Sequence, residues 1–308
     1  EEKFITQFIT HYKKIVHLLL TQPAKRIGAL NYLTEKEGVL KQEATTEKYV
    51  KKCVIEFFEN QVQRTPENVA VKYEDISLTY KEVNEYTNQL AHCLREKYNV
   101  TPQTNVGVIL GRSHLNVLAM IGIIKAGGCY VPIDHKYHIE RKEYILEDAE
   151  IQTVISTIDL FDEELSEKAA IINLDQFAFS EWDDSNLNIV NQLDDPSFVI
   201  YTSGSTGQPK GALHAHRMML GCIPAMEQTL GHWPRGNEVM WTPAEWAWIA
   251  GLYDALFPAW YYGTPVLAHR FAKFDPERAF ALLEKHKVGV SFIPPTALKM
   301  MRQVTKAQ

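Results

Sequence analysis

The sequence predicts an α/β fold, in which strands and helices alternate along the chain. An apolar run of strand length covers residues 106–110, and a second strand is expected at residues 129–131. Between them, residues 114–125 are expected to form an apolar helix that Gly127 and Gly128 stop, which completes a βαβ unit. The composition, 45% hydrophobic and 23% charged over 308 residues, can bury a substantial core in one large domain or two.

The start of the chain is expected to form one amphipathic helix, because apolar residues recur at helical spacing from Phe4 to Leu19. Residues 1–52 carry ten Lys/Arg and six Asp/Glu, whereas the remaining residues carry 22 and 32, so the front segment is distinct in charge. The first methionine is Met120, which leads us to expect a piece of a longer polypeptide. A solvated helix followed by a linker would give the same pattern.

A second helix is predicted to begin after Thr79. Thr79 and Glu82 have the spacing of a capping box, in which each side chain accepts a hydrogen bond from the backbone N–H of the other residue. Val83, Leu90 and Leu94 then recur on one helical face. We interpret this helix as a packing element rather than a source of chemistry.

A glycine- and hydroxyl-rich segment covers residues 201–211. It follows a predicted strand at residues 198–201, and a helix is expected to begin at residue 217. The glycines allow a sharp turn that brings backbone N–H groups close to an anion, and the hydroxyls and Lys210 can bind phosphate oxygens. The predicted polyphosphate-binding residues are Thr202, Ser203, Gly204, Ser205, Thr206, Gly207 and Lys210.

The spacing of this segment differs from that of two common phosphate loops. A Walker loop has Gly before its lysine, whereas Lys210 follows Pro209, and no dinucleotide fingerprint is present. A solvated linker can have a similar composition. The fixed backbone of Pro209 beside Lys210, together with the strand that precedes the segment, favours a phosphate loop.

The end of the chain predicts a helix–strand–helix unit. Asp275 followed by Pro276 is a typical helix start, and this helix is expected to reach about residue 286. A strand is expected at residues 288–292, and Pro295 begins another helix. This unit is consistent with a second sheet layer.

Three segments resemble the adenylate-forming (AMP-binding) superfamily. Residues 201–211 are similar to its phosphate-loop signature, and residues 124–134 and 78–84 are similar to elements of nonribosomal peptide synthetase adenylation domains. The resemblance covers roughly residues 50–308 and implies the large N-terminal subdomain of such an enzyme, with layered sheets flanked by helices. It also implies ATP and Mg²⁺ as cofactors and Lys210 and Thr206 as catalytic residues.

The implied reaction is activation of a carboxylic acid as an acyl adenylate with release of pyrophosphate. Transfer to a thiol, of coenzyme A or of a phosphopantetheinyl carrier protein, would follow. Residues 1–48 resemble the end of a condensation domain, and residues 49–308 an adenylation subdomain truncated before its adenine and ribose motifs. We therefore expect weak nucleotide binding and no turnover from these residues alone. The alternative is a catalytically inactive fragment or scaffold module of a multidomain synthetase.

The rear part of the chain is aromatic and resembles acyl-CoA synthetases. Five of the six tryptophans lie within 28 residues, which indicates a thick core or an apolar pocket. Peptide-synthetase domains carry a Phe-Asp pair whose Asp binds the α-amino group, but this chain has Ile249 and Ala250 there, so a buried ammonium would lack its counter-charge. The resemblance therefore implies an apolar acid. Candidate acid-binding residues are His216, Trp246, Trp248, Ala250 and Gly251.

The composition argues against several other functions. The net charge is −6 with no basic stripe, so nucleic acid is not an expected partner. The four cysteines form no CxxC pair, and His214 and His216 lack further ligands at suitable spacing, so no metal site is predicted. No apolar run has the length of a membrane span and the start is not a secretory signal, so no membrane contact and a cytoplasmic location are expected.

Overall fold

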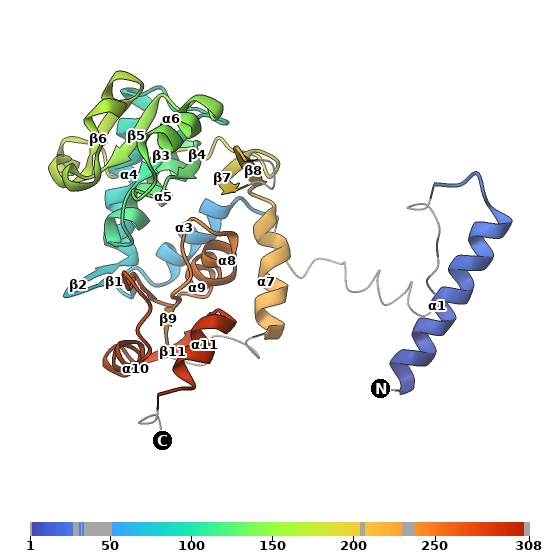
Figure 1. Ribbon diagram of the computed structural model, residues 1–308. Helices are drawn as coiled ribbons and strands as arrows, with labels where there is room; N and C mark the ends of the chain where they lie inside the picture. The colour runs from blue at the N-terminus through green and yellow to red at the C-terminus, as the bar shows by residue number, and fades with distance from the viewer. Residues whose placement is uncertain are drawn as a thin grey trace. The chain divides into compact units, whose positions relative to one another are not determined.

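The computed structural model describes residues 2–26, 31, 33, 51–203, 207–229 and 238–304. The chain divides into two units, Glu1–Val50 and Lys51–Gln308. Helix α1 (Glu2–Thr21) in the first unit confirms the helix expected at the start (Figure 1). Its exposed apolar side chains are Ile5, Phe8, Ile9, Tyr12, Val16, Leu19 and Leu20. The domain boundary predicted after residue 48 falls outside the described residues and stays a prediction.

A six-stranded sheet forms one layer of the second unit. Its strands, in spatial order, are β6 (Ala170–Asn173), β5 (Thr153–Ser156), β3 (Asn105–Ile109), β4 (Cys129–Pro132), β7 (Pro196–Ser203) and β8 (Pro209–Ala215). Neighbours are parallel from β6 to β7, whereas β7 and β8 are antiparallel. Helix α5 (His114–Ala126) follows β3 and precedes β4, which confirms the predicted βαβ unit, and it ends at Gly127 with a left-handed φ of 99°.

A five-stranded sheet forms the second layer (Figure 1). Its strands, in spatial order, are β11 (Val288–Ser291), β9 (Val239–Trp241), β10 (Val266–Leu267), β1 (Val69–Tyr73) and β2 (Ile76–Thr79). The pairs from β11 to β1 are parallel, and β1 and β2 are antiparallel. Chain segments far apart in sequence therefore meet in this layer.

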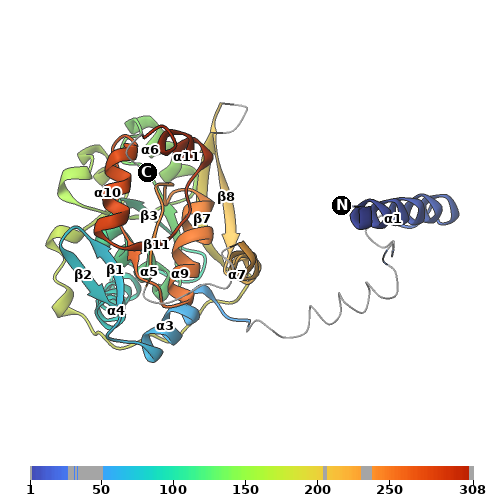
Figure 2. The same cartoon turned by 90° about the horizontal axis from the view of Figure 1, so that it is seen from below.

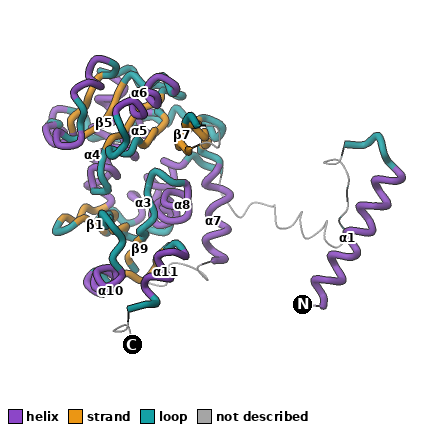
Figure 3. The backbone as a smooth tube through the Cα atoms, viewed as in Figure 1, coloured by secondary structure: helices purple, strands orange, loops and turns teal. Residues whose placement is uncertain are grey.

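Helices surround and separate the two sheets (Figure 3). The remaining helices of the second unit are α3 (Val54–Arg64), α4 (Tyr80–Glu96), α6 (Ile139–Asp148), α7 (Met218–Thr229), α8 (Ile249–Gly251), α9 (Phe257–Tyr261), α10 (Pro276–Lys285) and α11 (Pro295–Met301). A π-helical segment (Leu252–Leu256) joins α8 to α9, and short 3₁₀ turns cover Ile158–Leu160, Glu163–Glu167, Leu174–Gln176 and Phe179–Glu181. Helix α5 contacts β3 and β4 of one sheet and β1 of the other, which explains why it is apolar on all sides.

The helix–strand–helix segment at the end of the chain follows the sequence prediction. The Asp275 side chain accepts a hydrogen bond of 3.0 Å from the backbone N–H of Arg278 and so caps α10. Strand β11 and helix α11 follow in the expected order, and β11 belongs to the second sheet.

The helix predicted after Thr79 begins as expected. The backbone N–H of Glu82 donates to the Thr79 hydroxyl at 3.2 Å, and the backbone N–H of Thr79 donates to the Glu82 carboxylate at 2.8 Å. This capping box satisfies two backbone donors at the start of α4. Helix α4 then packs against α5.

Replacing Thr79 by Ala should lower the free energy of unfolding by about 1 kcal/mol, because the N–H of Glu82 loses its acceptor. Urea denaturation measures the change. The control is Thr157→Ala, at the start of a 3₁₀ turn where the threonine side chain makes no capping hydrogen bond. Equal effects of the two substitutions would contradict the capping role.

Candidate active site

The glycine- and hydroxyl-rich segment begins at the end of strand β7 and ends in strand β8, and these two strands are antiparallel neighbours. Strands β7 and β8 pair so that Thr202 lies opposite Lys210 and Ser203 opposite Pro209. Thr202 and Lys210 are both exposed, and Gly207 has a left-handed φ of 98° with open space where a Cβ would stand. Three predicted phosphate-binding residues, Gly204, Ser205 and Thr206, and the side chain of Ser203 lie outside the described residues.

Strand β8 was missing from the sequence prediction. It lies at the edge of its sheet, and Lys210, Ala212 and Leu213 are exposed, so no alternating apolar pattern marks it. Gly211 is the sequence feature that could have indicated a strand here. A Cβ there would lie 2.8 Å from Cγ1 of Val199 and 3.1 Å from Cζ of Tyr201, so β7 requires glycine opposite its side chains.

His216 lies between the end of β8 and the start of α7. Its ring is fully buried, and neither ring nitrogen has a hydrogen-bond partner among the described residues. Burial lowers the pKa of His216 to about 4, and the opposing influence of the Asp195 carboxylate is smaller. The ring is therefore neutral near pH 7.

The other candidate acid-binding residues form one turn before the π-helical segment. Trp246 is buried, whereas Trp248 is 70% exposed and Ala250 is half-buried. A Cβ on Gly251 would stand 2.3 Å from the carbonyl oxygen of Glu245, so this turn accepts only glycine at residue 251. The turn brings Trp246 and Gly251 together and leaves the Trp248 ring in solvent.

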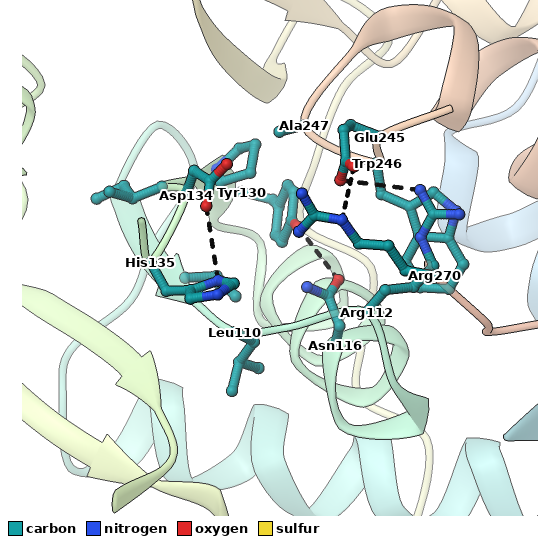
Figure 4. A pocket seen from close by; sticks show the side chains of 13 residues that line it. Leu110, Arg112, Asn116, Tyr130, Asp134, His135, Glu245, Trp246, Ala247 and Arg270 are labelled. Carbon is teal, nitrogen blue, oxygen red and sulfur yellow. Dashed lines mark hydrogen bonds and ion pairs between the residues drawn. The ribbon is translucent and has the colours of Figure 1, made fainter. Parts of the chain in front are cut away.

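A pocket beside this turn contains charged residues that the sequence did not single out (Figure 4). Arg112 follows β3, and its guanidinium donates to the carbonyls of Thr242 at 2.5 Å and of His269 at 3.3 Å. It also donates to the carbonyl of Ala244. Thr242 follows β9 and His269 follows β10, so Arg112 connects the two sheets. The sequence feature that could have indicated this role is a basic residue shortly after an apolar strand.

Charged and aromatic neighbours complete this contact. The Glu245 carboxylate lies 3.9 Å from Nη2 of Arg112 and 2.7 Å from Nε of Arg270. The Arg112 guanidinium lies 4.9 Å from the centre of the Trp246 ring. Burial lowers the pKa of Arg112 to about 10, against the favourable charge of Glu245. Arg112 therefore stays charged near neutral pH and holds the turn that carries the candidate acid-binding residues.

Other kinds of site find little support in the described ranges. They hold no group of three or more His, Cys, Asp or Glu side chains arranged to bind a metal ion. No helix within them has both the length and the apolar composition needed to cross a membrane.

Solved structures share the two-sheet architecture. The nonribosomal peptide synthetase FmoA3 aligns with a TM-score of 0.77 and 24% identity, over 97% of this chain and 32% of that chain. The o-succinylbenzoate CoA synthetase MenE of Bacillus subtilis aligns with a TM-score of 0.73 and 20% identity, over 83% of this chain and 65% of that chain. Together with the match of residues 58–308 to the AMP-binding enzyme, this shared fold confirms the expected N-terminal subdomain of adenylate-forming enzymes.

Sequence comparison identifies the family. The family model of the AMP-binding enzyme matches residues 58–308, so the chain belongs to the AMP-binding enzyme family, a family of adenylate-forming ligases. Bacitracin synthase 1 of Bacillus licheniformis is 35% identical over 244 residues, which are 79% of this chain and 5% of that protein. The chain therefore spans a small fraction of the length of this relative.

The buried His216 should make stability depend on pH. Because its pKa is near 4 in the folded state and 6.5 is the ordinary value, the unfolded chain binds more protons between these values. The contribution is fully present above pH 6.5 and is lost as the pH falls through 4, by roughly 3 kcal/mol in total. Urea denaturation of His216→Gln should show a shallower loss than that of His17→Gln, a control on helix α1. Parallel pH profiles would refute this assignment.

Replacing Arg112 by Met should lower the free energy of unfolding by about 3–5 kcal/mol, because buried carbonyls lose their donor. Guanidinium denaturation followed by tryptophan fluorescence measures it. The exposed Arg302→Met is the control and should change stability by less than about 0.5 kcal/mol. A loss below about 1 kcal/mol for Arg112→Met would show that the two sheets do not depend on this contact.

Proposed function

We propose that the chain supplies the phosphate-binding part of an acid-activating ligase. The observation that carries this proposal is the register of the β7–β8 hairpin, which sets Thr202 beside Lys210 at the mouth of a glycine-rich turn. A hydroxyl and an ammonium group that are both exposed can bind the same polyphosphate. Membership of the AMP-binding enzyme family supports ATP as that polyphosphate. A structure of FmoA3 at 23% identity is described as AMPPNP-bound.

The reaction would begin with attack of a substrate carboxylate oxygen on the α-phosphorus of ATP. The new carboxylate–phosphorus bond forms as the bond to the bridging oxygen of the β-phosphate breaks, and pyrophosphate leaves. Negative charge grows on the departing phosphates, where Lys210, Thr206, Thr202, Ser203, Ser205 and the backbone N–H groups of Gly204 and Gly207 would bind. Mg²⁺ would enter with ATP as part of the substrate, held by the phosphate oxygens.

We further propose that the acid lacks an α-amino group. Ile249 and Ala250 offer no carboxylate to an ammonium, and the adjoining turn places the buried Trp246 beside Gly251. An uncompensated ammonium in an apolar site would cost several kcal/mol. His216, neutral and buried after the hairpin, would help to shape the acid site without adding charge.

Transfer of the acyl group to a thiol would complete the reaction, with coenzyme A or a phosphopantetheinyl carrier protein as acceptor. MenE is a CoA synthetase whose structure holds a product analogue, OSB-NCoA, and FmoA3 is a nonribosomal peptide synthetase. The relatives thus support either acceptor. We place the reaction in the cytoplasm.

A second candidate function is a scaffold module in a multidomain synthetase. The exposed apolar residues of α1 favour it, because such a surface is suited to docking. The two functions differ in nucleotide binding and in acid-dependent pyrophosphate release. Because no turnover is expected from these residues alone, release should be measured on a longer polypeptide that contains them, with Mg-ATP and fatty, aryl and amino acids. An amino acid as the sole active substrate would contradict the proposed acid class.

Lys210→Ala should weaken Mg-ATP binding about tenfold or more, because a charged hydrogen bond contributes about 1.5–3 kcal/mol. Isothermal titration calorimetry measures the affinity. The control, Lys273→Ala, removes an exposed lysine outside the hairpin and should leave binding unchanged. Unchanged binding in Lys210→Ala, or no binding by the unaltered chain, would instead favour the scaffold function.

A further inference from the structure

The helix that follows the candidate acid-binding turn is interrupted by a π-helical segment. Helix α8 passes into the π-helical residues Leu252–Leu256 and then into α9. A π turn inserts an extra residue, so the side chains that follow are rotated by about 100° relative to a regular α-helix. Within this segment Tyr253 points inward and is only 1% exposed. Such π turns are frequent at functional sites.

Tyr253 contacts the base of the β7–β8 hairpin. Its hydroxyl lies 3.0 Å from Oγ of Ser197 on β7, and the Ser197 hydroxyl donates to the carbonyl of His214 on β8 at 3.0 Å. Because Ser197 has a single hydroxyl proton, it must accept from Tyr253. Burial raises the pKa of Tyr253, so this hydroxyl keeps its proton. A directed chain of hydrogen bonds therefore runs from the π-helical segment into both strands.

The aromatic surroundings hold Tyr253 in this position. Its ring centre lies 5.6 Å from that of Phe198 and 5.2 Å from that of Phe257. Phe198 is the residue of β7 that pairs with Tyr130 of β4. The tyrosine thus contacts the hairpin where β7 joins the rest of the sheet, and β8 lies at the outer edge (Figure 2). Nearer the turn, the Tyr201 hydroxyl donates to Asp148 on α6 at 2.5 Å.

We propose that Tyr253 is a positioning residue that couples the acid-binding turn to the phosphate-binding hairpin, and this proposal rests on the proposed function. The π-helical segment directly follows Ala250 and Gly251, so a shift of that turn moves the Tyr253 hydroxyl. Ser197, which lies about 16 Å along β7 from Thr202, transmits the shift to both strands. This chain of hydrogen bonds carries no charge and runs in one direction. Through it, a ligand at the acid-binding turn can affect the hairpin, and a nucleotide at the hairpin can affect the turn.

The test is hydrogen exchange at residues 249–261 with and without Mg-AMPPNP, followed by mass spectrometry. In the unaltered chain, nucleotide at the hairpin should slow exchange in this segment about fivefold or more, the lower end of typical coupling between sites. Tyr253→Phe keeps the ring and removes the hydroxyl. It should abolish this response while Mg-AMPPNP affinity changes less than about twofold. If Tyr253 only stabilised the fold, Tyr253→Phe would change the exchange response and the Mg-AMPPNP affinity together.

Matched variants sharpen the result. Ser197→Ala should abolish the same response, and the double variant should lose nothing more, since both residues act in one chain of hydrogen bonds. Tyr80→Phe removes a buried hydroxyl with no hydrogen-bond partner among the described residues, and Ser156→Ala removes one bonded to Ile109. Both controls should keep the response.

Two results would overturn the proposal directly. One is nucleotide binding without slower exchange at residues 249–261 in the unaltered chain, and the other is a full response in Tyr253→Phe. Absence of Mg-AMPPNP binding to the unaltered chain would overturn the proposed function and this inference with it, so the two failures are distinguishable.

Discussion

One buried cation, the guanidinium of Arg112, joins strand ends of the two sheets. Burying a charge costs several kcal/mol unless neighbours compensate, and here backbone carbonyls, the Glu245 carboxylate and the Trp246 ring do so. The carbonyls follow β9 and β10, whereas Arg112 follows β3, so one side chain fixes strand ends of both sheets. Since the segment after β9 leads into α8, the contact also places the candidate acid-binding turn.

Sequence alone predicted the features whose causes are local. Thr79 with Glu82, Gly127 and Asp275 each determine a helix end through the backbone beside them. The role of Arg112 could not be predicted, because its carbonyl acceptors are 130 to 157 residues away in sequence. The density of aromatic residues also could not show that Trp246 is buried and Trp248 exposed, because this difference arises from the turn around Gly251.

Lys125, in one of the three segments that resemble the adenylate-forming superfamily, has a structural role instead of a chemical one. Lys125 is buried, and its ammonium donates to Oδ1 of Asn84 at 2.6 Å and to Oδ1 of Asn88 at 2.5 Å. Burial lowers its pKa to about 7, against the favourable charge of Glu59. Lys125 lies in residues 124–134 and Asn84 in residues 78–84. Two of the three segments that carry the family resemblance therefore meet in the core, and the hairpin carries the proposed phosphate chemistry.

The position of Lys210 on an edge strand has a consequence for self-association. An unpaired strand edge exposes a row of backbone N–H and C=O groups to which another chain could add a strand. Strand β8 begins with Pro209, which lacks an N–H, and continues with the charged Lys210. Both residues disfavour strand addition and fibre growth. The lysine proposed to bind phosphate thus also helps to keep separate copies of the chain apart.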